Sequence, residues 1–522
     1  MDGVDGTAGG AAERYVDPCR GRVVGPSENA TKEIDEVVKV AATKMACVAE
    51  LCRQRKPKRC DAKKPYREAD GTCNNLENPE WGAAGACMRR MLPQIYSDGV
   101  SSPRVSRRSG EPLPSARLVS YTAHPQGFAS DERMSRMVQR FGQFVAHDIS
   151  SALVIDAEGP EFFQNLGRDT YNCCDPTQSS DPECYRIDIP EQDPFYAQFN
   201  TTCMNFRRAA PCLTCKLGPR EQVNALTSYI DGSPIYGISE GQTRRLRLLQ
   251  KGMDHKTCAV LANNTPPPPP IITAEEISAL IDRKIQHIVY NELLEEILGP
   301  EVMKREQLRP RRDGYTKYNA SVDATVVNEF TTAAFRLGHA LVGRDPDVNR
   351  LQRIEAEIPT SEERHKKLTP ECQPRFAYIC SVYETSTYRR YGDPEVTRHL
   401  FRFANGPKPF GVDLFAFDVQ RGRDHGLRSY ADFVEHCVPG VRIESFRDLE
   451  QLMPKDAVDV FERLYKDVRD VDLFSAGLAE SGSHVVGPTF TCLIAPMFAK
   501  LKFGDRFYYE HGGQAGSFTP GK

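Results

Sequence analysis

Two histidines in this sequence each close an apolar stretch with helical spacing. His147 follows Phe144 and Val145, and Gln143 lies four residues before it, on the same face of a helix. A polar pair on an apolar face is costly to bury unless it faces a cavity or a ligand. The pair therefore suggests a ligand site, although a hydrogen-bonded core histidine explains the same pattern.

His339 ends the second stretch, with Arg336 three residues earlier and Gly338 beside it. An imidazole can bind a metal, a glycine lets a flat group approach, and a guanidinium can hold a carboxylate. The three residues suit a large, flat, anionic ligand that contains a metal. An ordinary helix with an exposed arginine accounts for them equally well.

A third candidate is Asp418, which begins the charged segment 418–426 directly after the apolar segment 414–417. A run of charges is usually a solvated face, but this one follows a segment that belongs in a core. A carboxylate there could accept the second N–H of a metal-bound histidine and raise the basicity of its ring.

Oxygen atoms recur at alternate residues in the segment 227–233, on Thr227, Asp231, Ser233 and the carbonyl of Tyr229. In an extended segment, alternate side chains share one face. Oxygen ligands that include a carboxylate suit a hard cation such as calcium. A turn rich in serine and threonine is the alternative interpretation.

These candidates need helices to position them, and apolar residues at helical spacing predict several. A Gly-Pro pair stops the clearest of them after residue 298. Residues 60–120 are rich in turns, residues 222–236 are partly extended, and five prolines at 266–270 predict a linker or surface loop. The expected helices cover residues 31–52, 130–148, 274–298, 325–342 and parts of 425–475 and 486–502.

Charge and hydropathy exclude some classes of function. The net charge is −3, so no overall field favours nucleic acid or an anionic membrane. No apolar run is long enough to span a bilayer. We therefore expect no nucleic-acid partner and no membrane span.

The 17 cysteines cluster in the chain, most densely in the loop 170–220, and predict disulfides made in an oxidising compartment. A zinc site on Cys212 and Cys215 is the alternative, although no second pair follows at zinc-ribbon spacing. Glycosylation sequons add to the case for a secreted glycoprotein; they begin at Asn29, Asn200, Asn263 and Asn319. The first residues lack a signal peptide, so we expect that the true start is missing.

Together these segments resemble the animal haem peroxidases, nearest the invertebrate peroxinectin and chorion-peroxidase branch. The similar stretches follow the order of the family and cover most of residues 60–515. They are 66–76, 79–82, 98–104, 142–148, 224–237, 286–299, 330–341, 420–427, 486–490 and 504–507. The resemblance implies a mostly α fold, a single large helical domain around a central haem over residues 56–522, preceded by an N-terminal extension at 1–55.

The resemblance also implies roles for the candidate residues. His147 corresponds to the distal histidine and Gln143 to the distal glutamine, whereas His339 corresponds to the iron ligand and Arg336 to the arginine near a haem propionate. Asp418 would strengthen the iron ligand. The implied calcium ligands are Asp148, Thr227, Tyr229, Asp231 and Ser233, and Cys60 and Cys73 correspond to a family disulfide.

The implied activity is the reduction of hydrogen peroxide with oxidation of a small donor, such as a phenol, or of protein tyrosine. The distal imidazole would take the proton from the inner peroxide oxygen and return it to the outer one. A catalytically impaired, secreted matrix adhesion protein on the same scaffold is the alternative. The sequence contains no Arg-Gly-Asp or Lys-Gly-Asp motif for adhesion.

The sequence departs from the family in several places. Ala146 stands where many members carry an aspartate ester-linked to haem, and Asp418 stands where they carry asparagine. The segment with the distal arginine and the second ester-forming glutamate is not found, which suggests a deletion near 255–275. Segment 345–395 is atypical, and the C-terminus looks truncated. We therefore expect non-covalent haem b and place the peroxidase activity in doubt, because one preorganised charge is worth roughly 10²–10³ in rate.

Overall fold

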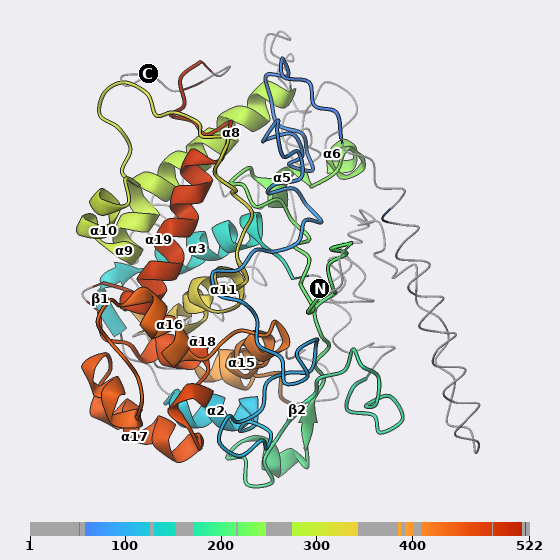
Figure 1. The fold of residues 1–522 in the computed structure, drawn as a ribbon, viewed down its shortest axis with the longest axis vertical. Helices are drawn as coiled ribbons and strands as arrows, with labels where there is room; N and C mark the ends of the chain where they lie inside the picture. The colour runs from blue at the N-terminus through green and yellow to red at the C-terminus, as the bar shows by residue number, and fades with distance from the viewer. Residues whose placement is uncertain are drawn as a thin grey trace, which may run out of the picture.

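The computed structural model describes residues 52, 58–125, 130–152, 172–215, 218–246, 274–342, 385–387, 392–400, 402, 409–482, 484–513 and 517. These residues form a mostly helical fold with little sheet, as expected (Figure 1). The expected helix at 31–52, apart from residue 52, and most of the segment 345–395 lie outside the described residues.

Helices dominate the described part of the chain. The α-helices are α2 (Ala116–Ala123), α3 (Arg136–Ile149), α5 (Ser233–Tyr236), α6 (Glu240–Leu246), α8 (Ala274–Ile288), α9 (Leu294–Leu298), α10 (Pro300–Arg305), α11 (Asn328–Thr332), α14 (Pro394–Thr397), α15 (Leu414–Asp424), α16 (Tyr430–Cys437), α17 (Lys455–Leu464), α18 (Leu473–Ala479) and α19 (Pro488–Phe503). The 3₁₀ helices are η1 (Tyr196–Phe199), η3 (Ala334–Leu341), η4 (Phe446–Gln451) and η5 (Val468–Asp470), and η2 (Val289–Leu293) is a π-helical turn.

Two short antiparallel pairs make up the sheet in the described residues. Strand β1 (Ser130–Ser135) pairs with β4 (Thr385–Thr387), with Ser130 opposite Thr387. Strand β2 (Ile187–Asp188) pairs with β3 (Cys203–Met204), with Ile187 opposite Met204. Neither pair provides a layer on which helices could pack, so the core lies between the helices.

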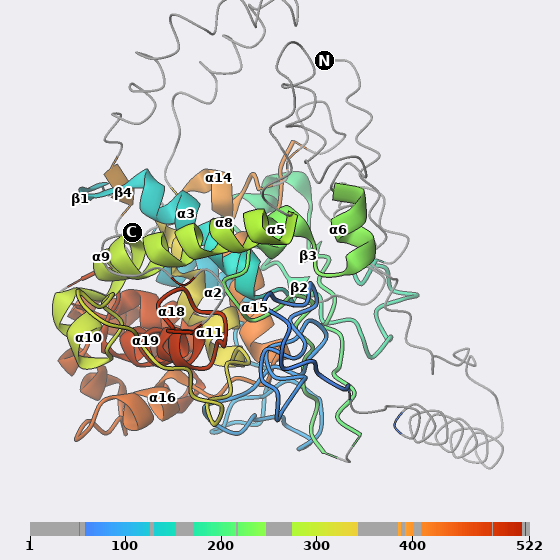
Figure 2. The same ribbon diagram turned by 90° about the horizontal axis from the view of Figure 1, so that it is seen from above.

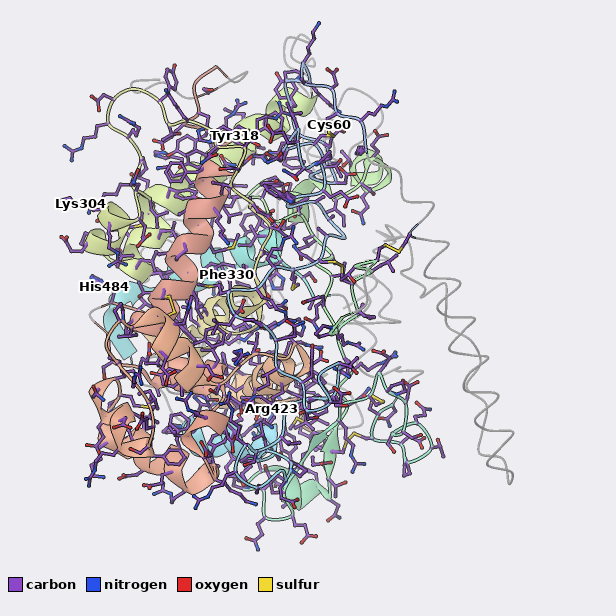
Figure 3. All side chains as sticks on the ribbon, viewed as in Figure 1. Cys60, Lys304, Tyr318, Phe330, Arg423 and His484 are labelled. Atoms are coloured by element: carbon purple, nitrogen blue, oxygen red, sulfur yellow. A yellow bond between two sulfur atoms is a disulfide. The ribbon has the colours of Figure 1, made fainter. Side chains whose placement is uncertain are left out.

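The core is built around α19, the long red helix of Figure 1. Phe498 of this helix packs edge-on against Phe330 of α11 and against Tyr290, whose hydroxyl donates to the Phe498 carbonyl at 2.7 Å. Phe330 in turn stacks on Phe335 at 4.6 Å. Figure 3 shows Phe330 near the centre of the molecule. These aromatic contacts fix α11 and the start of η3 against α19.

The predicted helix at 274–298 is present as one continuous run of α8, η2 and α9. It ends at Gly299, which has a φ of +79°, and a Cβ there would lie 2.1 Å from the ring of His484. Only glycine combines this left-handed backbone with such a close approach. The Gly-Pro stop signal in the sequence therefore has a steric basis.

Two of the predicted helices are wrong in detail. Residues 130–135 form strand β1, because they pair with β4 from a distant part of the chain, and the helix begins only at Arg136. The helix predicted at 325–342 begins at Asn328 and is interrupted at Ala333, where φ is −134°. Beyond this break the chain winds into the 3₁₀ helix η3, whose tighter turns place residues three apart directly above one another.

Six disulfides link the described cysteines, and the pairing Cys60–Cys73 is confirmed. The zinc alternative is wrong, because Cys212 is bonded to Cys87 and Cys215 to Cys52. The remaining bonds are Cys173–Cys184, Cys174–Cys203 and Cys437–Cys492. Within the described ranges, no helix combines the length and the apolar character needed to cross a membrane.

Candidate active site

The ring of His339 is oriented by a buried carboxylate. Its Nδ1 atom lies 2.6 Å from Oδ2 of Asp418, and Asp418 is fully buried on α15. The start of α15 is fixed in turn by Asp413, whose side chain accepts from the amide of Ala416 and also pairs with the buried Arg117. A capped helix thus delivers one carboxylate to one imidazole.

The same carboxylate also binds Arg336. The Nη1 atom of Arg336 donates to Oδ1 of Asp418 at 2.6 Å, and its Nε donates to the carbonyl of Thr331 at 2.9 Å. Asp418 can bind both Arg336 and His339 because η3 is a 3₁₀ helix, in which these two residues lie one above the other. Arg336, which the resemblance places near a propionate, therefore uses Nη1 and Nε to bind Asp418 and Thr331.

The chemistry of these residues fits a haem iron. With Nδ1 engaged by Asp418, His339 keeps Nε2 for a metal, and that atom bonds to none of the described residues. A carboxylate on the far nitrogen is the usual arrangement behind a metal-bound histidine. Beside it, a Cβ on Gly338 would meet nothing within 4 Å. A large planar group could therefore approach this face of η3.

His147 lies on α3, which packs against η3 and so brings the second histidine toward the first. Its side chain is exposed. Partial desolvation by the surrounding protein lowers the pKa of His147 below its ordinary value, and the positive charges of His339 and Arg336 lower it further. A neutral imidazole at neutral pH can accept a proton.

Gln143, one turn earlier on α3, is also exposed, and its side chain accepts from Gln139 at 3.2 Å. The sequence places Gln143 and His147 on one helical face, and the structure keeps them there on a single helix. Among the described residues, neither side chain is tied to the other. Both side chains are exposed, and the single hydrogen bond from Gln139 holds Gln143 on the helix surface.

The oxygen-rich segment converges on Asp148, the residue after His147. This fully buried carboxylate accepts from the amides of Asp231 at 3.1 Å, Gly232 at 3.2 Å and Ser233 at 2.8 Å. The hydroxyl of Ser233 donates to the Asp148 carbonyl at 2.9 Å. These bonds tie the end of α3 to the start of α5.

The other predicted cation ligands gather at the same place. The Thr227 hydroxyl donates to Oδ2 of Asp231 at 2.8 Å, and Oδ1 of Asp231 accepts from the same Ser233 amide that Asp148 binds. Tyr229 is buried beside them, with its hydroxyl donating to the Trp81 carbonyl at 2.6 Å. Of the predicted set, the structure therefore brings Asp148, Thr227, Asp231 and Ser233 together in a tight loop.

Burial strongly affects the acidity of the two carboxylates. It raises the pKa of Asp148 to about 6. Burial and the charge of Asp148 together raise the pKa of Asp231 to about 8. A bound divalent cation would offset both effects, because it favours the charged forms. Within the described residues, no three His, Cys, Asp or Glu side chains converge closely enough to form a metal site by themselves. A cation here would rely on hydroxyl and carbonyl oxygens, as calcium does.

The sequence missed a buried polar layer behind this loop. Arg67 is held by Asp505 through bonds of 2.8 and 2.6 Å, and Gln286 of α8 donates to the carbonyl of Ile230 at 2.9 Å. Asp282, one turn before Gln286, is also buried. In the sequence, only the position of Gln286 within a helical period hinted at this layer. The residues that bond to one another in it are separated by 56 to 438 positions.

Comparison with known proteins decides the family. The animal haem peroxidase family matches residues 66–268 and 279–522 of the chain. The chain belongs to the animal haem peroxidase family. Membership in this family implies a haem and supports a peroxidase-type function. The interruption of the match at 269–278 overlaps the region where the distal arginine segment is not found in the sequence.

Individual animal haem peroxidases and related folds agree with this assignment. The chain is 32% identical to a chorion peroxidase of Drosophila melanogaster over 87% of its own length and 63% of that protein. It is 30% identical to a peroxidasin homolog of Mus musculus over 86% of its length and 35% of that protein. In fold it resembles peroxidase A of Dictyostelium discoideum, with a TM-score of 0.63, 22% identity, and coverage of 87% and 94% of the two chains.

Proposed function

We propose that this chain is a haem-dependent peroxidase that reduces hydrogen peroxide and oxidises a small phenolic donor or protein tyrosine. The observation that carries the proposal is the pair formed by His339 of η3 and the fully buried Asp418, together with the packing of η3 against α3, the helix of His147. Haem, when bound, supplies an iron that accepts electrons from the donor and passes them to peroxide.

Each candidate residue of the site would have a defined task in this reaction. His339 would hold the iron, and Asp418 would orient its ring and increase its basicity through the 2.6 Å bond. His147 would accept the proton from the inner peroxide oxygen and deliver it to the outer oxygen, which leaves as water. Gln143 would position the peroxide. Ala146 cannot form an ester, so haem b would be held without that covalent tether.

A calcium ion is part of the proposal. Asp148 directly follows His147, so a cation bound by Asp148, Asp231 and the hydroxyls of Thr227 and Ser233 would fix the end of α3. The six disulfides and the exposed sequon residues Asn200 and Asn319 support a secreted glycoprotein. The peroxidasin likeness supports a partner in the extracellular matrix.

The experiment that tests the proposal is an absorption spectrum of the purified protein reconstituted with haem, recorded before and after peroxide. We expect a Soret band that changes on addition of peroxide, together with peroxide-dependent oxidation of a phenolic donor. A folded protein that binds no haem would contradict the proposal. It would favour an inactive matrix adhesion protein, to which the missing distal arginine segment also points.

A further inference from the structure

Asp282 is a buried carboxylate with an unsatisfied oxygen. Its side chain is 9% exposed, and its Oδ1 atom has no hydrogen-bond partner among the described residues. Its Oδ2 atom lies 3.9 Å from Nε of Arg67, beyond hydrogen-bond distance, because Arg67 is paired more closely with Asp505. A buried carboxylate in this state is costly, and it calls for an ion or an ordered water as its partner.

The unsatisfied oxygen points at the oxygen-rich loop. A Cβ built on Gly232 would lie 3.1 Å from Oδ1 of Asp282, so this atom sits directly over the backbone between Asp231 and Ser233. The amide of the same glycine donates to Oδ2 of Asp148 at 3.2 Å. Asp282 and Asp148 therefore approach one glycine of the loop.

The position of Asp282 is set by α8. Four residues later on the same helical face, Gln286 donates to the carbonyl of Ile230 and accepts from the amide of Tyr509. Both views of the fold place α8 beside α5, whose first residue is Ser233 (Figures 1 and 2). The carboxylate is thus held over the loop by a clamped helix.

We propose that Asp282 completes the cation site by accepting, through Oδ1, a hydrogen bond from a water bound to the cation. This inference rests on the proposed calcium site. Asp148 and Asp231 would contact the ion directly, and Asp282 acts through water because three acidic side chains do not converge within the described residues. Calcium commonly keeps water among its oxygen ligands, and its affinity depends on the number of charged groups around it.

The role of Asp282 is tested by calcium titration of the full-length, haem-loaded protein after chelation, followed by calorimetry. Wild type is compared with Asp282→Asn, and with Glu292→Gln, which changes an exposed carboxylate on the same helical run. We expect Asp282→Asn to weaken calcium binding by about 10–100-fold, the usual effect of losing a group behind a metal ligand. Glu292→Gln should bind as wild type does.

Thermal unfolding gives a second readout that a purely structural residue would not produce. In chelator, Asp282→Asn should unfold at or above the wild-type temperature, because the variant no longer buries a third acidic group near Asp148 and Asp231, with only Arg67 at 3.9 Å as its ion-pair partner. In calcium, it should be stabilised less than wild type, because ligand stabilisation follows affinity. The unfolding temperature of Asp282→Asn should therefore be at or above that of wild type in chelator and below it in calcium.

The outcomes separate the two proposals. Wild-type protein that binds no calcium would overturn the calcium site and this inference together. Calcium binding that is equal in wild type and Asp282→Asn would overturn only the role of Asp282. If Asp282→Asn unfolds in both chelator and calcium, the residue is structural and the inference also fails. If the inference is correct, Asp282→Glu, which keeps the charge, should bind calcium with an affinity between those of wild type and Asp282→Asn. An affinity no higher than that of Asp282→Asn would contradict the inference.

Discussion

The two sides of the proposed haem site are built very differently. On the iron-binding side, His339 and Arg336 share Asp418, which is fully buried at the middle of a capped helix. On the peroxide side, His147 is exposed, and the described structure around it is fixed mainly through its neighbour Asp148. The first side holds its imidazole by a direct bond, whereas the second holds the backbone and leaves the ring free.

This difference fits the two tasks. An iron ligand must keep one orientation, and a carboxylate on its second nitrogen provides that orientation while raising its basicity. A group that accepts a proton and then returns it must reach two oxygens in turn, so its ring benefits from some freedom. The calcium loop would place α3 without restraining the imidazole. Variants on the two sides should therefore fail in different ways.

The largest effect is expected at His339. His339→Ala should abolish stoichiometric haem binding, because the protein loses its iron ligand, and the Soret band should be lost from the reconstituted protein. His436→Ala, at an exposed histidine in the last turn of α16, should bind haem as wild type does. His339→Gly should regain a Soret band when imidazole is added. Unchanged haem binding in His339→Ala would place the iron elsewhere.

A different failure is expected at His147. His147→Ala should retain haem, because the iron ligand is intact, but its reaction with peroxide should slow by about 10²–10⁴, the usual contribution of a general acid–base group. Stopped-flow recording of the Soret change after mixing with peroxide measures this rate. Gln139→Ala, which removes only the partner of Gln143, should stay close to wild type. A His147→Ala rate within a few-fold of wild type would remove the proton-transfer role.

How far the sequence predicted this site depends on the range of the contacts involved. Gln143 and His147 were predicted on one helical face because their spacing is local, and α3 confirms the helix. The bond from Asp418 to His339 was suggested by residue type alone, and it spans 79 residues. The 3₁₀ winding that lets Arg336 share this carboxylate was not predictable, because it results from the break at Ala333.

The same limit applies to the fold. The helix at 274–298 was predicted because its apolar period and its Gly-Pro stop are both local signals. Strand β1 was missed because its pairing with β4 depends on residues 250 or more positions away. Asp282 was missed for a related reason. Its proposed role depends on the loop 227–233, about 50 residues earlier in the sequence, which lies next to its side chain. Local chemistry was therefore predictable, whereas the identity of partners was not.

Asp418 sharpens the comparison on the iron-binding side. Asp418→Asn should raise the Fe(III)/Fe(II) midpoint potential, because an amide leaves the imidazole of His339 less anionic, and haem affinity should fall by about 10–100-fold. Spectroelectrochemical titration of the haem-loaded variant measures the potential. Asp188→Asn, at an exposed carboxylate, provides the control. An unchanged midpoint would show that the charge of Asp418 does not reach the iron.

The smallest expected effect is a pH dependence that belongs to the peroxide side alone. His147 must be neutral to accept a proton, and its pKa is lowered first by desolvation and also by the charge of Arg336. The rate of reaction with peroxide should therefore be constant near neutral pH and fall as pH drops through this pKa, with a midpoint below the ordinary 6.5. Below the midpoint, the rate should fall about tenfold per pH unit, as for a single titrating group.

Stopped-flow rates measured across pH test this expectation, with haem occupancy recorded at each point. His147→Ala should lose the acid limb, whereas Asp418→Asn should keep it, because Asp418 acts on the other imidazole. An acid limb that persists in His147→Ala would assign the titration to a different group. It would also contradict the assignment of proton transfer to His147 and of iron binding to His339.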